Sequence, residues 1–497
     1  MGDYRNSHLF LMLIKRFILK LFRYNTDMTE KIDLVKKLQS NEDISFKERM
    51  SIVYNLSIPS ILAQVSEIVM QYIDAAMVGV LGAQASAAIG LVSTSTWLFG
   101  GIIAGVTMGF SVQVAQAIGS GKEDRSRRIF KESILASFLM SVVFGFVGAM
   151  VSSSLPRWLG ADVSLWKDAT DYFLFFALFL PARMLQRLGV TMLQCIGNMK
   201  ISSIFSGLMC LLDVIFNYFL IFPSRRISFF GIEIWMPGAG LGVLGAQLGT
   251  SFAVVVCMVL CLWYAAVKEE GLCLKGVHGS WLPSKEVMRD AFRIGFPMVL
   301  EQTATTGAQV VSTRIVAPLG TVAIAANSFA VTAESICYMP GFGVANAATT
   351  MVGQAVGARR KDMANSFAWL TTFTGMVIMS LTAIVMFFLC PYIFAFLTPD
   401  LEVQVLGVEV LRIELFAEPF FAASIVATGA LRGAGDTLVP GVMNLVSIWG
   451  VRITLAFVLT KVIGLNGAWI AMALELTVRG ILFLIRLKRG KWLETIN

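Results

Sequence analysis

The chain has 497 residues, of which 56% are hydrophobic and only 14% are charged, and its formal net charge is +8. Soluble domains average about 45–50% apolar and about 25% charged residues, so this composition excludes a soluble globular, disordered or collagen-like protein. The mean hydropathy of +0.74 indicates a membrane protein. The seven Cys are scattered, mostly singly, inside hydrophobic stretches, and both His residues lie outside them, which excludes a disulfide scaffold and a His-ligated metal site.

The N-terminal segment contains a hydrophobic stretch, residues 9–22, that is interrupted by Lys15, Arg16 and Lys20. It is shorter than the roughly 20 residues that a transmembrane helix needs. Two interpretations stay open. The stretch is a basic helix in the membrane interface, or translation starts at Met28 and residues 1–27 are not part of the mature protein.

Twelve hydrophobic stretches follow, and each is long enough to cross a bilayer. They predict an all-α membrane protein with twelve transmembrane helices. The predicted spans are residues 52–80, 84–118, 132–154, 168–192, 201–222, 240–267, 290–318, 322–356, 366–394, 405–430, 441–462 and 465–487.

Basic residues in the loops predict the orientation, because cytoplasmic loops are enriched in Lys and Arg. With odd-numbered spans running outward, the inner loops and the tail contain 18 Lys and Arg, and the outer loops contain five. We therefore expect both termini to be cytoplasmic in a multi-pass protein of the inner (plasma) membrane. The same bias accounts for the net charge, so no nucleic-acid partner is expected.

An internal repeat is the strongest organisational signal, because shifting the first half by 238 residues superimposes it on the second without a gap over about 140 residues. Beyond the loop that begins at Pro223, the two halves of the sequence align again when the first half is shifted by 222 residues. The pairs at the first offset include Pro59 and Pro297, Gln64 and Gln302, Gly105 and Gly343, Gln116 and Gln354, Gly119 and Gly357, Pro181 and Pro419, and Gly197 and Gly435.

Each copy contains six spans, so the copies have the same topology and form a parallel repeat of two lobes. The predicted boundaries are a cytoplasmic lead-in (1–51), an N-lobe (52–267), a cytoplasmic linker (268–289), a C-lobe (290–487) and a cytoplasmic tail (488–497). Two similar lobes around a cleft are the architecture of an alternating-access carrier, although a channel stays an alternative.

Span 1 carries a polar stripe, since Gln64, Glu67, Gln71 and Asp74 fall within about 80° of one helix face. Ionisable residues inside a span are costly and mark functional sites by default. We interpret Asp74 and Glu67 as cation-binding residues, and Gln64 and Gln71 as residues of the substrate cleft. A hydrogen-bonded stripe between helices is the alternative.

Span 5 places Asp213 and Asn217 four residues apart on one face, with no Lys or Arg within seven residues of Asp213. A carboxylate with an amide oxygen suits a small hard cation or a proton. Thr250 in span 6 offers a hydroxyl for the same shell. We therefore expect Asp74, Asp213 and Asn217 to bind the coupling ion, as ligands of Na⁺ if the ion is sodium. Arg183 and Arg187 in span 4 are expected to extend toward the cytoplasmic surface.

The second lobe repeats the polar stripe on span 7 with its acid displaced, since Glu301 aligns with Ala63 while Asp74 aligns with Ser312. Charges of both signs occur in this lobe, so a structural ion network is an equal alternative to a role in transport. The residues that we expect to line the substrate cleft from this lobe are Glu301, Gln302, Thr305, Gln309 and Glu334.

No phosphate-binding loop, zinc motif or catalytic Ser, Cys or His pattern occurs in the sequence. We therefore expect a protein that is not an enzyme, needs no cofactor and takes its energy from an ion gradient of Na⁺ or H⁺.

Four segments together resemble the multidrug and toxic compound extrusion (MATE) family across residues 52–487. They are 59–82, 353–358, 431–437 and 464–468. The resemblance implies a twelve-helix antiporter that exports amphipathic, often cationic, organic compounds against Na⁺ or H⁺. Asp74 resembles the aspartate of the family's N-lobe cation site.

Other site residues match the family less closely. Thr250 resembles the span 6 hydroxyl of that cation site. Asp213 and Asn217 are in the reverse order of one branch, and Glu301 lies about one turn before the glutamate of another. The coupling ion therefore stays open between Na⁺ and H⁺.

The function that we expect is cation-coupled export of amphipathic organic cations by a monomer in the lipid bilayer. A flippase for lipid-linked saccharides from the same broad superfamily is the alternative. That activity would require a cleft lined by cations to hold pyrophosphate, whereas the stripes on spans 1 and 7 are acidic or neutral.

Overall fold

The computed structural model describes residues 36–40, 42–229, 232–277 and 279–494. Nine of the described helices are long and apolar enough to cross a membrane, or ten when one bent pair counts as a single span. The prediction of an all-helical, multi-span membrane protein is confirmed. Both interpretations of the hydrophobic stretch 9–22 and of a start at Met28 lie outside the described residues.

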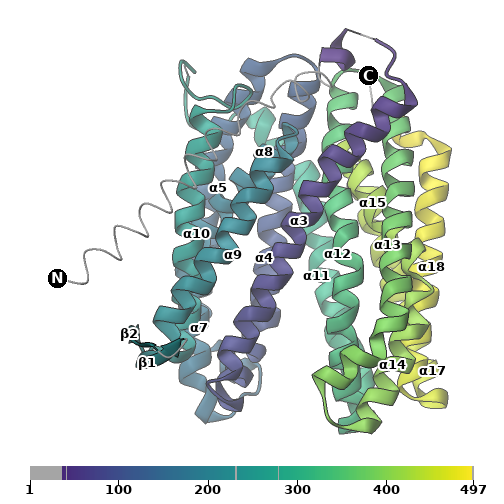
Figure 1. Cartoon of the computed structure of the whole chain (residues 1–497). Coiled ribbons are helices and arrows are strands. Elements are labelled where there is room, and N and C mark those ends of the chain that lie inside the picture. The colour runs from purple at the N-terminus through teal and green to yellow at the C-terminus, as the bar shows by residue number, and fades with distance from the viewer. Residues whose placement is uncertain (1–35, 41, 230–231, 278, 495–497) are drawn as a thin grey trace.

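The N-lobe occupies the purple-to-teal side of the bundle (Figure 1). Its long helices are rich in apolar residues, and the first begins at a capping box in which the Ser45 hydroxyl accepts from Glu48 N and the Glu48 carboxylate accepts from Ser45 N. The helices are α3 (Phe46–Gly79), α4 (Ala83–Gly119), α5 (Glu123–Val151), α6 (Leu155–Trp158), η2 (Val163–Leu165), α7 (Trp166–Leu178), α8 (Leu180–Cys195), α9 (Met199–Ile221) and α10 (Gly242–Val267).

The C-lobe occupies the green-to-yellow side of the bundle. Its first helix, which is rich in polar residues, and the short helices of its α14/α15 pair are not among those that pass as membrane spans on length and apolarity. The helices are α11 (Lys285–Val316), η3 (Ala317–Leu319), α12 (Thr321–Gly357), α13 (Lys361–Leu397), α14 (Leu401–Leu415), α15 (Glu418–Gly433), α16 (Leu438–Val446), η4 (Ser447–Ile453), α17 (Thr454–Ile463), α18 (Leu465–Arg489) and η5 (Lys491–Leu493).

The fourth span of each lobe is broken rather than continuous. Helices α7 and α8 meet at a bend of 51° just before Pro181, and α14 ends just before α15 begins with Pro419 near its start. Proline lacks the backbone N–H that would continue the helix and is favoured in the first turn of a new one. The two prolines are partners in the sequence repeat, so both lobes have inherited the same interruption.

Two further segments differ from the predicted elements. The loop after α9 forms an antiparallel hairpin of β1 (Pro223–Phe229) and β2 (Ile232–Ala239), which the hydropathy pattern did not indicate because it detects only apolar stretches of span length. The eleventh span contains a π-helical segment, η4, between α16 and α17. Such segments interrupt α-helices most often near functional residues.

The two ends of the bundle differ. Helix α3 begins and α4, α12 and α18 end at the upper end in Figure 1, whereas the β1–β2 hairpin lies at the opposite end. A short segment, residues 36–40 and 42–45, lies at the upper end and is called the strap here. Its Leu38 and Ile44 are buried in a C-lobe core cluster, while Gln39 donates to Ile118 O of α4 at 3.2 Å. The strap therefore joins the two lobes at this end, called the strap end below.

The lobes contact each other mainly through their first two helices. Helix α4 packs against α11, and α12 packs against both α3 and α4. Glycines permit the close approach: a Cβ on Gly343 of α12 would lie 2.6 Å from Ile61 Cα of α3, and one on Gly105 of α4 would lie 3.3 Å from Val299 N of α11. Both pairs map onto each other by the 238-residue shift, so the interface itself has the symmetry of the repeat.

Candidate functional site

The N-lobe brings two of the predicted acids together through a shared amide. Asn217 Nδ2 donates to Asp74 Oδ1 at 2.7 Å and to Asp213 Oδ2 at 3.0 Å, which connects α3 to α9. The two carboxylate oxygens are therefore no farther apart than the sum of these distances. Two carboxylates this close attract a positive ion, because each disfavours the other's charge in a poorly hydrated environment.

The helix geometry explains this arrangement. Asp213 and Asn217 are separated by one turn of α9, so their side chains lie on the same face. Gly249 of α10 lies directly behind Asn217: a Cβ at this position would overlap Asn217 Oδ1 and approach Asn217 N to 2.9 Å. A glycine is thus required for α10 to pack closely enough to hold the asparagine toward α3.

The α9 residues of the cluster are buried, Asp74 is half-buried, and the cluster is incompletely bonded. Asp213 and Asn217 have no exposed surface in the described structure, and Asp213 Oδ1 and Asn217 Oδ1 each lack a hydrogen-bond partner there. Neither acid makes an ion pair within 4.0 Å with a described Lys or Arg. Buried oxygens in native proteins normally have partners, so two unpartnered acceptors beside two acids indicate a place for a bound cation or proton.

Arg183 of α8 is a basic residue that interacts electrostatically with this cluster. The sequence predicted instead that its side chain extends toward the cytoplasmic surface. Its guanidinium lies over the Phe176 ring at 4.9 Å, and its Nε has no hydrogen-bond partner among the described residues. It interacts over a distance with Asp74 and Asp213 but does not neutralise them by direct contact.

Two other predicted cation-binding residues have different positions. The Thr250 hydroxyl donates to Ala246 O at 3.1 Å and is within interaction distance of Asp213, which places it beside the cluster. Glu67 lies two turns of α3 away from Asp74 and is paired with Arg187 at 4.0 Å. Arg187 therefore points toward α3 instead of toward the membrane surface, and Glu67 is not brought into the cluster.

The polar stripe on α3 continues away from the cluster. Gln64 is half-buried and Gln71 is exposed. Tyr72, next to Gln71, donates to Thr332 O of α12 at 2.8 Å. Tyr72 therefore contacts the C-lobe, and the lining of a substrate cleft by Gln64 and Gln71 stays a prediction.

The C-lobe stripe on α11 is more strongly bonded. Glu301 accepts from Arg432 at 2.8 Å and from Asn444 at 2.7 Å, with the two charged side chains 13% and 15% exposed. The Thr305 hydroxyl donates to Glu301 O. Gln302 packs on Gly101 of α4, so it lies between the lobes, and Gln309 is exposed. The stripe therefore divides into an ion-paired acid and residues at the lobe interface.

Glu334 is buried within the C-lobe instead of exposed on a cleft wall. It interacts electrostatically with Glu414 and Glu418, which are fully buried, and with Arg452. All four side-chain oxygens of Glu414 and Glu418 lack hydrogen-bond partners among the described residues. Nearby, Glu475 is paired with Arg479 at 3.0 Å and with Arg452 at 3.6 Å, so ion pairs and unpaired acids occur side by side in the described part of this lobe.

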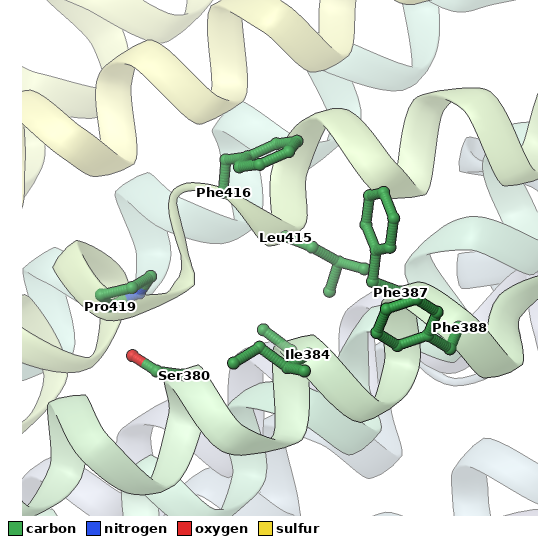
Figure 2. Close-up of a pocket in the computed structure, with 8 residues that line it drawn as sticks. Ser380, Ile384, Phe387, Phe388, Leu415, Phe416 and Pro419 are labelled. Atoms are coloured by element: carbon green, nitrogen blue, oxygen red, sulfur yellow. The ribbon is translucent and has the colours of Figure 1, made fainter.

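An apolar pocket lies on the C-lobe, and none of these acids lines it (Figure 2). Its volume is about 410 Å³, and it lies between α13 and the break that separates α14 from α15. Phe388 and Phe416, which line it, are 67% and 75% exposed. An apolar hollow on the outer surface of the C-lobe is suited to contact with lipid, and we do not assign it to the cargo.

Several residues of this site were not predicted from the sequence. Arg432 and Asn444 bond Glu301, and Gly249 positions Asn217. A signal for Asn444 was available, since it is an amide in an apolar span. Arg432 lies just beyond the predicted span 405–430, and nothing in the local sequence of Gly249 distinguishes this glycine from others. No group of three His, Cys, Asp or Glu residues that could hold a metal occurs in the described part of the chain.

A duplicated, multi-span helical fold with buried acids is typical of a membrane transport protein. The sequence profile of the MatE family matches residues 59–219 and 297–458, one segment in each lobe. The chain therefore belongs to the MatE family of transporters and not to a family of enzymes.

Curated relatives match nearly the whole chain. The probable multidrug resistance protein NorM of Thermotoga maritima is 25% identical over 443 residues, which is 88% of this chain and 92% of that protein. The protein of the same name from Halalkalibacterium halodurans is 24% identical, with 91% and 96% covered.

Solved structures share the fold at lower identity. A MOP-superfamily transporter from Pyrococcus furiosus superimposes with a TM-score of 0.82 at 19% identity, covering 93% of this chain and 98% of that one. A variant of the Vibrio cholerae MATE transporter VcmN gives a TM-score of 0.80 at 16% identity, covering 89% and 97%.

Proposed function

We propose that this protein is a cation-coupled antiporter that exports amphipathic, cationic organic compounds by alternating access, with Na⁺ or H⁺ as the coupling ion. The observation that carries the proposal is the N-lobe cluster. Asp74 and Asp213 share the amide of Asn217, and two neighbouring oxygens have no partner among the described residues. A small positive ion would complete this set of acceptors.

Ion binding and cargo binding would then oppose each other. An ion bound between Asp74 and Asp213 neutralises the negative charge on the inner face of α3, and this weakens the hold on a cationic cargo. When the ion leaves, the bared carboxylates again favour the cargo. Such negative coupling between two sites is typically a factor of about 5–150 in affinity, which is enough for exchange.

The curated relatives support the choice of cargo, since both are described as probable multidrug resistance proteins. The acidic and amide side chains of α3 and α11 suit organic cations better than the pyrophosphate of a lipid-linked saccharide. The excess of Lys and Arg in alternate loops supports a cytoplasmic location for the strap end and for both termini.

The test uses purified protein in vesicles that contain ethidium, with a Na⁺ gradient and a pH gradient imposed separately. We expect one gradient to drive ethidium movement in the unaltered protein. Asp74→Asn and Asp213→Asn should each lower the initial rate by about tenfold or more, the range of a lost coupling between two sites. Asp124→Asn is the control, because this carboxylate is 97% exposed and outside the cluster.

Each outcome has a defined meaning. Rates near that of the unaltered protein in both cluster variants would reject the mechanism, provided that each variant inserts at the normal level. Movement of ethidium down its own gradient without response to either ion would indicate a channel or a uniporter. Lack of ethidium movement with transport of a lipid-linked saccharide would support the flippase alternative.

A further inference from the structure

The sequence repeat preserves two glutamines, Gln116 and Gln354, that the cation cluster leaves unexplained. Gln116 lies three residues before the end of α4, and Gln354 lies three residues before the end of α12. Both positions are at the strap end, where the two lobes meet. Their neighbours Gly119 and Gly357 are also repeat partners.

Each glutamine bonds the backbone of the opposite lobe. Gln116 Nε2 donates to Gly433 O of α15 at 3.2 Å, and Gln354 Nε2 donates to Cys195 O of α8 at 2.9 Å. Gly433 and Cys195 are themselves related by the 238-residue shift. The two bonds are therefore one contact made twice, once in each direction across the interface.

The acceptor carbonyls of Cys195 and Gly433 have no partner within their own helices because of the way in which α8 and α15 end. A glycine with positive φ follows each helix, Gly197 at +92° and Gly435 at +88°. In this type of helix end, the following N–H groups bond earlier carbonyls: Gly197 N bonds Gln194 O at 2.8 Å, and Gly435 N bonds Arg432 O at 2.9 Å. The carbonyl of the last helical residue is left without an intrahelical partner, and the glutamine of the other lobe supplies one.

The helices that carry the glutamines also cross at these positions. A Cβ on Gly119 would overlap Gln354 O, and a Cβ on Gly357 would overlap Gln116 O. The backbones of α4 and α12 are therefore in direct contact beside both bonds. Gln354 is 1% exposed, so water cannot replace its partner without separation of the lobes.

We propose that Gln116 and Gln354 are positioning residues that form a paired latch, which holds the lobes together at the strap end and must open on both sides for the carrier to face the cytoplasm. This inference rests on the proposed alternating access. A helix carbonyl without a partner is costly when buried, so the latch favours the closed state until the lobes part far enough for water to reach both carbonyls.

The experiment measures the distance between the lobes and needs neither cargo nor a gradient. Spin labels are placed at Asp124→Cys in the N-lobe and Lys361→Cys in the C-lobe, both exposed at the strap end, in a chain whose seven native Cys are replaced. Distance distributions are recorded by pulsed electron paramagnetic resonance. Gln116→Met and Gln354→Met remove the amides with little change in side-chain size.

We expect each variant to raise the ratio of long to short distances by about fivefold, the effect of one lost hydrogen bond. The double variant should show about the product of the two effects, if they are additive. Gln247→Met is the matched control: this glutamine is also buried, but it donates to Ser251 within α10. Its distance distribution should equal that of the unaltered protein.

Unchanged distances in both single variants, or an equal change in the Gln247→Met control, would overturn the latch. Gln116→Asn and Gln354→Asn are made in parallel, because their shorter side chains stay polar yet cannot reach the opposite carbonyl. They answer the question if a Met variant does not fold. Since the measurement is independent of efflux, a failed latch and a failed antiport mechanism give different results.

Discussion

In both lobes an asparagine of the fifth span donates to an acid of the first: Asn217 to Asp74 at 2.7 Å in the N-lobe, and Asn444 to Glu301 at 2.7 Å in the C-lobe. The acids are not repeat partners. Glu301 lies 11 residues, about three helical turns, closer to the strap end than the position that matches Asp74.

The surroundings of the two acids differ more than their asparagines do. Glu301 is neutralised by Arg432, whereas Asp74 has a second carboxylate, Asp213, on the same amide and no ion pair within the described chain. The charge of Glu301 is thus balanced by Arg432, although Arg432 Nε and Asn444 Oδ1 have no hydrogen-bond partner among the described residues. The N-lobe cluster has no such balancing charge in the part of the chain that the structure describes. The duplication has kept the helix frame and changed the charge balance around the two acids, and we expect the lobes to differ in function accordingly.

The variant expected to show the largest effect of this difference is Glu301→Gln. Removal of one partner of a buried ion pair typically costs about 3–5 kcal/mol, because the other charge is left unneutralised. We expect a clear fall in the thermal unfolding midpoint of the purified protein, while its response to the coupling gradient is retained. Asp74→Asn should show the opposite pattern, with coupling lost and the midpoint maintained.

The double variant Glu301→Gln, Arg432→Met serves as the control for this prediction. Removing both charges leaves no unpaired ion, so the midpoint should recover most of the loss. Loss of coupling in Glu301→Gln with an unchanged midpoint would show that the C-lobe acid, too, takes part in ion exchange, and the contrast between the lobes would fail.

A substitution at Gly249 is expected to have an effect of intermediate size. It tests the position of the Asn217 side chain while the amide itself is kept. Gly249→Ala places a methyl group against Asn217 Oδ1 and forces α9 away from α10. Overpacking of this kind costs about 1–3 kcal/mol, and the higher helix propensity of Ala offsets up to about 1 kcal/mol. We expect a lowered midpoint together with slower gradient-driven efflux.

Gly207→Ala is the matched control in α9, because no atom lies within 4 Å of a Cβ at that position. Its midpoint should be equal or higher, with normal efflux. Equal behaviour of the two variants would mean that close packing of α10 does not position the asparagine.

The sequence predicted the fold well because its signals are local. Apolar stretches of span length and the 238-residue repeat are each visible without knowledge of contacts. Pro181 and Pro419 also indicate the breaks in the fourth spans. A hydropathy pattern alone does not detect such a break, because the residues on both sides of the proline are apolar. The hairpin after α9 lies below the length that this pattern detects.

The candidate site could be predicted only in part. Asp74 and Asp213 were found because an acid in an apolar span is rare, but their shared amide depends on how far α3 and α9 rotate, which periodicity does not determine. The pairs of Glu301 with Arg432 and of Glu67 with Arg187 join residues more than 100 positions apart. Such contacts result from packing, and no local sequence pattern contains them.

The smallest effect is expected for Glu67→Gln, which tests whether the N-lobe cation site extends along α3 beyond Asp74. Glu67 shares the α3 face with Asp74, but its pair with Arg187 is 4.0 Å long, and the two side chains are 45% and 38% exposed. Partly exposed pairs of this kind contribute about 0–1 kcal/mol. Glu67→Gln should therefore change the ethidium efflux rate by less than about fivefold, with no shift in its dependence on the coupling ion. A loss as large as that of Asp74→Asn would extend the ion site two turns along α3 and would make Arg187 part of the exchange, since its charge would then be released whenever the coupling ion binds Glu67.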